Sequence, residues 1–140
     1  MVLNAEDIMS PLPPVLSGDL TVAAATEAME LEHRGFVLVG SNHNIEGIVT
    51  EWDFVSKILA AKKDPNTTTI REIMSTEIKS IPEDTPTRKV TVIMSRNGIR
   101  RILVGKNGKY VGIITSRDIL RIFEDYVENV ENIAGKYGLL

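Results

Sequence analysis

The chain has 140 residues, a formal net charge of −3 and a sequence pI near 5.4, and 43% of its residues are hydrophobic. Nucleic acids and anionic membranes attract proteins with a dominant basic field, so this acidic balance argues against either as the main partner. The absence of cysteine excludes disulfides, thiolate metal sites and cysteine nucleophiles. A chain of this length is expected to form one compact domain. The sequence has neither a signal-peptide pattern nor an apolar run of about 18 residues, so we expect the protein in the cytoplasm and not in a membrane.

The first half of the chain predicts alternating helices and strands. Apolar Val22, Ala25 and Met29 recur at helical spacing, and the polar, proline-interrupted stretch over 62–69 reads as a linker. In chain order we expect a short helix over 5–10, an extended segment near Val15 and Leu16, a helix over 22–33, strands over 36–39 and 45–49 joined by a turn over 41–44, and a helix beginning at Glu51.

The second half repeats this order after the linker. Thr85 and Pro86 are typical of an N-cap and a first helical residue, Gly98 is typical of a helix end, and Asn107-Gly108 indicates a type I′ hairpin turn. In chain order we expect a short helix over 70–75, an extended segment over 78–81, a helix that stops at Gly98, strands over 102–104 and 110–114 joined across 106–109, and a helix beginning at Ser116.

The last helix is expected to be longer than its counterpart in the first half. Apolar residues keep helical spacing to about Ala134 with acids on the other side, and residues 135–140 are expected to fray. The extension indicates either a dimerisation or partner-docking helix, or a helix that folds back over its own core. Its apolar positions are Ile119, Ile122, Phe123, Tyr126, Val127, Val130 and Ile133, and its acids are Glu124, Asp125, Glu128 and Glu131.

The two halves of the chain form an internal sequence repeat. Residues 47–53 read GIVTEWD and residues 112–118 read GIITSRD, an offset of 65 residues that also relates the sequence IMS at 8–10 to the same sequence at 73–75. A period this long, present only twice, argues against a solenoid and for two half-domains that close a shared core by pseudo-two-fold symmetry. Each half would be marginal alone and should need its twin to bury enough apolar surface.

A tandem β-α-β-β-α unit with Gly-Ile-(Val/Ile)-Thr-x-x-Asp at its last strand-to-helix junction resembles the cystathionine-β-synthase (CBS) domain family. The resemblance implies an α/β (α+β) fold in which two CBS repeats form one Bateman module. It implies repeat 1 at 5–61, a linker at 62–69, repeat 2 at 70–124, and a C-terminal helix extension and tail at 125–140. It further implies a regulatory homodimer that senses an adenine nucleotide (AMP, ADP or ATP) in the cleft between the repeats and signals to an effector protein.

The chemistry of the repeated junction can also be argued from its residues. Strands that end at Thr50 and Thr115 lead into helix N-termini, whose free N–H groups and dipole favour an anion such as phosphate. Asp53 and Asp118, three residues on, can accept both hydroxyls of a ribose diol. The alternative is a capping box, with Thr at the N-cap and an acid at N3.

Two features of the junction favour the ligand site over the capping box. Both acids are Asp, which is shorter than the preferred Glu for reaching back to the N-cap N–H group. Both also follow a strand that begins with glycine, Gly47 or Gly112, which would let a ligand approach the backbone. A cap and a ligand site are not mutually exclusive.

Basic residues distinguish the two potential sites. In nucleotide-sensing members of the family, a basic pair at the positions of Arg100 and Arg101 faces the ribose-binding Asp of the preceding repeat, so the resemblance implies that the Asp53 site holds the phosphates. The alternative is that the arginines are scattered surface charges or partners of Glu51 and Asp84. The arginines expected to converge on the phosphates are Arg34, Arg100, Arg101 and Arg117.

The second site is expected to be unlike the first. Built on Thr115 and Asp118, it would meet Gly35, Phe36 and Trp52, which offer no phosphate partner. We expect it to take a less charged ligand or to stay empty.

The adenine base is expected in an apolar slot between the halves, where exposed strand backbone could read its edge. Apolar residues at such places are more often plain core, which is the alternative. The residues expected to line the slot are Val15, Ile48, Ile78, Lys79, Ile99 and Ile113.

No other constellation points to chemistry. His33 and His43 have no cysteine or acid at metal-ligand spacing and are expected to be solvated, and neither a Walker nor a Rossmann glycine motif is present. We therefore expect no catalysis and no metal requirement. The functions left open beside nucleotide sensing are a structural dimerisation module with vestigial pockets and a sensor of NAD or S-adenosylmethionine.

Overall fold

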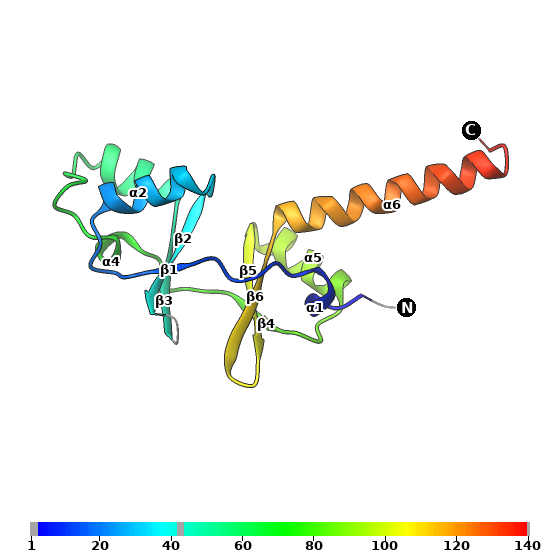
Figure 1. The fold of residues 1–140 in the computed structure, drawn as a ribbon, viewed down its shortest axis with the longest axis horizontal. Helices are drawn as coiled ribbons and strands as arrows, with labels where there is room; N and C mark the ends of the chain where they lie inside the picture. The colour runs from blue at the N-terminus through cyan, green and yellow to red at the C-terminus, as the bar shows by residue number, and fades with distance from the viewer. Residues whose placement is uncertain (1–2, 42–43, 140) are drawn as a thin grey trace. The chain divides into compact units, whose positions relative to one another are not determined.

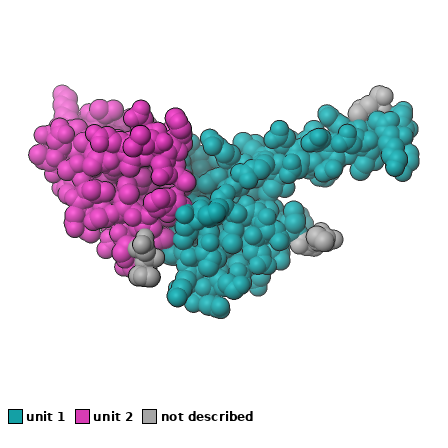
Figure 2. All heavy atoms as spheres, viewed as in Figure 1, with its two compact units in different colours: residues 1–12, 79–140 teal, residues 13–78 magenta. Residues whose placement is uncertain are grey.

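The computed structural model describes residues 3–41 and 44–139, which form two compact units (Figures 1 and 2). Unit 1 comprises Met1–Leu12 and Lys79–Leu140, and unit 2 comprises Pro13–Ile78. The elements of unit 2 are β1 (Val15–Leu16), α2 (Val22–Leu31), β2 (Phe36–Ser41), β3 (Asn44–Thr50), α3 (Glu51–Phe54), the π-helix η1 (Val55–Leu59) and α4 (Ile70–Ile73). Those of unit 1 are α1 (Ala5–Ile8), β4 (Ser80–Pro82), α5 (Thr87–Asn97), β5 (Arg101–Lys106), β6 (Lys109–Thr115) and α6 (Ser116–Lys136).

Each unit is built on a three-stranded sheet with the same topology. In unit 2, β1 pairs in parallel with β2, and β2 pairs antiparallel with β3, with Phe36 opposite Thr50. In unit 1, β4, β5 and β6 follow the same order, with Arg101 opposite Thr115. The repeated β-α-β-β-α order predicted from the sequence is therefore confirmed.

The hairpin turn of unit 1 has the geometry that its sequence predicts. Asn107 and Gly108 have φ angles of 51° and 76°, as a two-residue type I′ turn requires. Gly98 ends α5 in the left-handed conformation with φ 60°, also as predicted. In the turn predicted over 41–44, Asn42 and His43 lie outside the described residues.

Several predicted boundaries are wrong by a few residues. The prediction of Thr85 as the N-cap of α5 is wrong, because Pro86 occupies that position and Thr85 is buried with its carbonyl accepting from the N–H group of Ala5 at 2.8 Å. The helix predicted over 22–33 ends at Leu31, and His33 takes a left-handed φ of 50°. The extended segment predicted over 78–81 forms strand β4 over Ser80–Pro82.

The prediction that residues 135–140 fray is also wrong for its first two residues. Helix α6 includes Gly135 and Lys136, so it is 21 residues long. The first-half counterpart differs in kind, because α3 passes after four residues into the π-helix η1.

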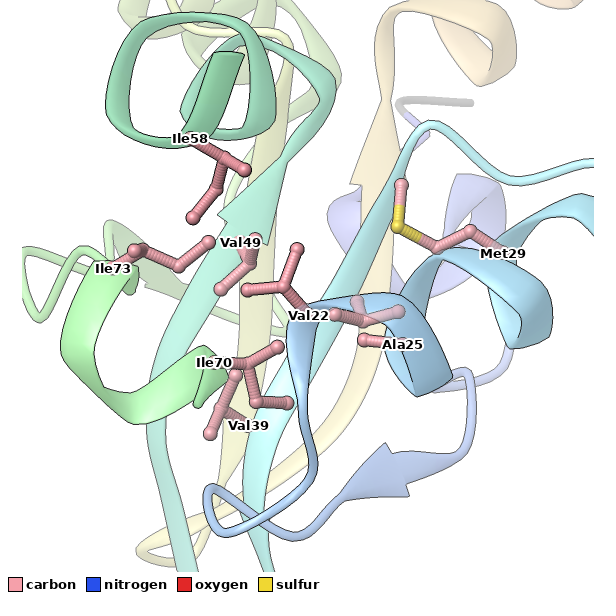
Figure 3. Close-up of a cluster of buried hydrophobic side chains, with 9 residues drawn as sticks. Val22, Ala25, Met29, Val39, Val49, Ile58, Ile70 and Ile73 are labelled. Atoms are coloured by element: carbon pink, nitrogen blue, oxygen red, sulfur yellow. The ribbon is translucent and has the colours of Figure 1, made fainter. Parts of the chain in front are cut away.

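The two cores exchange helices between the sequence halves. Ile70 and Ile73 of α4 belong by sequence to the second half, yet they pack in unit 2 with Val22 and Val49 (Figure 3). Ala5 of α1 packs in unit 1. The described residues form one hydrophobic cluster in each unit, and each cluster is completed by the short helix of the other half.

The chain itself fills the space above the two glycines that begin the repeated motif. A Cβ atom at Gly47 would lie 2.6 Å from Met74 Sδ and 2.8 Å from the carbonyl oxygen of Ser75, and one at Gly112 would lie 3.0 Å from the carbonyl oxygen of Ser10. The prediction that these glycines admit a ligand to the backbone is therefore wrong. Residues 74–75, which follow α4, pack against Gly47, and residues 9–10, which follow α1, pack against Gly112.

We expect Gly47→Ala to destabilise the protein by about 1–3 kcal/mol, because the added methyl group overlaps a backbone oxygen that the β3 pairing holds in place. Urea unfolding followed by circular dichroism measures the change. Gly105→Ala is the matched control, since its Cβ would first meet an atom at 3.6 Å, and its effect should stay within about 0.5 kcal/mol. Equal destabilisation by the two variants would contradict the close approach.

Candidate functional site

The repeated junction forms a capping box in both units. The Asp53 Oδ2 atom accepts from the backbone N–H group of Thr50 at 2.8 Å and from its hydroxyl at 3.2 Å. The Asp118 Oδ2 atom accepts the same two bonds from Thr115 at 2.8 and 2.9 Å. The shorter Asp side chain closes the capping box in both units, so the argument that its length disfavours the box is wrong.

A capping box alone does not indicate a ligand in this chain. Thr69 and Glu72 form the same pair of hydrogen bonds at the start of α4, at 2.7 and 3.0 Å. The backbone N–H group of Thr69, and then its hydroxyl, hold the pKa of the exposed Glu72 carboxyl below its usual value. What distinguishes the Asp junctions is burial, since Asp53 and Asp118 are 8% and 3% exposed.

In unit 2, the second oxygen of Asp53 faces a lysine. The Lys57 Nζ atom lies 2.8 Å from Asp53 Oδ1 and donates to the carbonyl oxygen of Ile73 at 2.7 Å. Lys57 belongs to the π-helix η1, a form of helix found often at functional sites. Its side chain is 44% exposed, so the ammonium group can leave the carboxylate for solvent.

In unit 1, the second oxygen of Asp118 has two donors. The Ser10 hydroxyl donates to Asp118 Oδ1 at 2.8 Å, and the Arg121 guanidinium donates to the same atom at 3.0 Å. Ser10 reaches the carboxylate because its backbone pairs with Ile113 of β6. The Ser10 nitrogen lies 2.8 Å from the Ile113 carbonyl oxygen, and the Ile113 nitrogen lies 2.9 Å from the Ser10 carbonyl oxygen. Both oxygens of Asp118 therefore accept two hydrogen bonds each.

The two carboxylates differ in the acceptor capacity that remains. An ionised carboxylate offers about four lone-pair sites. The four hydrogen bonds to Asp118 fill them, whereas Asp53 accepts two on Oδ2 and one from Lys57 on Oδ1. Among the residues that the structure describes, no further donor reaches Asp53, so one acceptor site stays open, and withdrawal of the lysine would open a second.

The predicted arginines have diverse surroundings within their own units. The Arg34 Nε atom pairs with Glu32 at 3.0 Å, an acid that the sequence reasoning did not consider. Arg100 and Arg117 are exposed, and Arg101 is half-buried at the start of β5 opposite Thr115. Their convergence on phosphate stays a prediction.

The residues predicted to line the base slot fall into two groups. Ile48 and Ile113 are engaged through their backbones by Ser75 and Ser10, and Ile113 is buried. The others lie at the surface or half-buried, and their contact with a base stays a prediction. They are Val15, Ile78, Lys79 and Ile99.

Equivalent surface grooves lie beside both junctions. In unit 1, a groove of about 480 Å³ is lined by α5 and the first turns of α6, including Met94, Ile99 and Leu120. In unit 2, a groove of about 380 Å³ lies at the positions 65 residues earlier, including Met29 and Arg34. The groove of unit 1 has the more apolar lining residues.

The sequence reasoning missed Ser10, Lys57 and Arg121 as partners of the repeated aspartates. Lys57 and Arg121 follow their aspartates by four and three residues, the spacings at which helix side chains meet, so helix periodicity could have identified them. Ser10 recurs as Ser75 in the repeat, but its contact with Asp118 needs the exchanged segment and could not be read from spacing.

No group of three or more histidine, aspartate or glutamate side chains with metal-binding geometry occurs among residues 3–41 and 44–139. Within the same residues, no helix is both long and apolar enough to cross a bilayer.

Comparisons with known proteins agree with the repeated fold. The family model of the CBS domain matches residues 5–60 and 70–125. An uncharacterized protein of Methanopyrus kandleri is 32% identical over 127 residues, which are 88% of this chain and 65% of that protein. The chain thus spans about two thirds of that relative's length.

Two solved structures illustrate what similar folds bind and form. A CBS domain pair in complex with 5′-methylthioadenosine and S-adenosyl-L-methionine has a TM-score of 0.77 and 28% identity, covering 90% of this chain and 99% of its own. A hexameric CBS-CP12 protein from bloom-forming cyanobacteria has a TM-score of 0.73 and 28% identity, covering 99% and 91%. With two matched repeats and these neighbours, the chain belongs to the CBS domain family.

Proposed function

We propose that the chain is a regulatory module that binds an adenosyl ligand through Asp53. The observation that carries the proposal is the buried Asp53 carboxylate, which is fixed by Thr50 and keeps an acceptor site that no other described residue fills. A ribose diol donates two hydrogen bonds to one carboxylate, which matches the open site and the one that Lys57 occupies. The solved complex of a similar CBS pair with adenosyl compounds supports this ligand class.

Within this class we favour the adenine nucleotides AMP, ADP and ATP. The Lys57 ammonium that leaves Asp53 would stay close to the ligand, where a phosphate can accept from it. The predicted arginines Arg34, Arg100, Arg101 and Arg117 would add further donors. S-adenosylmethionine is the second candidate, because the similar CBS pair binds it.

We propose that Asp118 stabilises unit 1 and does not bind a ligand, because its four acceptor sites are filled within that unit. This is the vestigial pocket considered from the sequence, restricted to one of the two junctions. A homodimer, an effector protein that reads the ligand, and a cytoplasmic location remain predictions that accompany this function.

Calorimetry with AMP, ADP, ATP, NAD and S-adenosylmethionine tests the proposal. We expect at least one ligand to bind with micromolar affinity, about −8 kcal/mol. Trp52 adjoins Asp53, is 67% exposed and is the only tryptophan, so its fluorescence should change with the same midpoint. No heat from any of these compounds up to millimolar concentration would contradict a sensor and favour the structural dimerisation module.

A further inference from the structure

Helix α6 carries an apolar stripe with the spacing of a coiled coil. Its apolar residues follow one another at alternating intervals of four and three, the pattern of heptad positions d and a. A third apolar residue recurs every seven, at position e. The d and a residues are Ile119, Phe123, Tyr126, Val130 and Ile133, the C-cap residue Tyr137 continues their spacing, and the e residues are Leu120, Val127 and Ala134.

Most of this stripe is uncovered in the structure. Past its first turns, α6 extends away from the rest of unit 1 (Figures 1 and 2), and every residue from 123 to 133 is exposed. Phe123, Tyr126 and Tyr137 expose 62%, 65% and 70% of their surface. So large an apolar face on one helix marks an interaction surface.

The exposed area matches what one copy buries in a stable dimer. Seven large side chains of the stripe are exposed, and at roughly 200 Å² for each fully exposed side chain their fractions amount to about 800 Å². One partner in a standard protein interface buries about 800 Å². The seven are Leu120, Phe123, Tyr126, Val127, Val130, Ile133 and Tyr137.

The distribution of charge selects a second copy as the partner. Positions e and g flank a coiled-coil seam, and acids there would repel when identical helices meet. In α6 the e positions are apolar, and the g positions are Ile122, Asn129 and Lys136. The four acids Glu124, Asp125, Glu128 and Glu131 stand at b, c and f, away from the seam. No like-charge contact opposes self-association, and no acid flanks the seam to recruit a basic partner.

The stripe is continuous with the groove between α5 and α6. Ile119 and Leu120 belong to both, and Met94 and Ile99 extend the apolar surface into the groove. A helix laid along α6 would therefore find apolar surface from the groove to the C-terminal end of α6.

We propose that the heptad face of α6 pairs with the same face of a second copy. The proposal refines the homodimer of the proposed function by naming its surface, and it does not depend on which ligand binds.

Single cysteines test this surface, because the chain has none of its own. Oxidation of Val130→Cys, at a seam position, should give a covalent dimer of twice 15.5 kDa at least tenfold faster than oxidation of Glu128→Cys, at the opposite f position. In sedimentation, Val130→Glu should raise the dimer dissociation constant at least tenfold, whereas Glu128→Gln should leave it unchanged. Circular dichroism verifies that each variant is folded.

The outcomes separate the surface from the assembly. A wild-type dimer in which the two cysteines cross-link equally, or in which Val130→Glu has no effect, overturns the α6 surface and leaves the homodimer. A wild-type monomer at high micromolar concentration overturns both, while ligand binding measured on the same sample is unaffected by either result.

Discussion

Asp53→Ala is expected to weaken adenosyl-ligand binding by roughly tenfold to 150-fold for each ribose hydrogen bond that it removes. The variant removes a charged acceptor from the ribose, and each hydrogen bond to a charged group contributes about 1.5–3 kcal/mol. Asp53→Asn should lose less, because the amide keeps one acceptor oxygen. Calorimetric titration with the ligand that binds the wild-type protein measures both losses.

The matched control is Asp118→Ala, which changes the equivalent residue of the other unit. Because the hydrogen bonds to Asp118 all come from its own unit, its loss should lower the free energy of unfolding while leaving ligand affinity nearly intact. If the alanine variant unfolds, Asp118→Asn replaces it as the control, because asparagine keeps the shape of the side chain. Loss of affinity with Asp118→Asn and full affinity with Asp53→Ala would reverse the assignment of the two junctions.

The fold could be predicted from the sequence because its main signals are local or periodic. The repeat of 65 residues fixes the order of elements in both halves, and Asn107-Gly108 specifies a turn through its own backbone preferences. The repeated threonine and aspartate identify the junctions at which both carboxylates are indeed buried. Boundaries such as Thr85 against Pro86 were missed because a tertiary contact with Ala5 decides them.

The difference between the two carboxylates could not be predicted in the same way. Asp53 and Asp118 occupy identical positions in the repeat, and their helix neighbours Lys57 and Arg121 are both basic. What separates them is the Ser10 hydroxyl, which approaches Asp118 over a separation of 108 residues. That contact exists because residues 9–10 cross above Gly112. In the sequence this close approach is visible only as a glycine that both copies of the motif share.

The same exchange of segments makes Ile70 a structural residue of unit 2 although it follows the linker. Ile70 is fully buried beside Val22 and Val49, and the N–H group of Ile70 donates to Leu20 at 2.9 Å. Truncation there leaves a cavity that the surrounding β-branched side chains cannot fill.

Ile70→Ala should therefore lower the free energy of unfolding by about 2–5 kcal/mol. Urea unfolding followed by Trp52 fluorescence measures it, because Trp52 lies in unit 2. Leu31→Ala removes a similar side chain that is 81% exposed on α2, and its effect should stay within about 0.5 kcal/mol. If Ile70→Ala left the Trp52 transition where it is, α4 would not complete the core of unit 2. Residues 74–75 would then lose the anchor that carries them over Gly47.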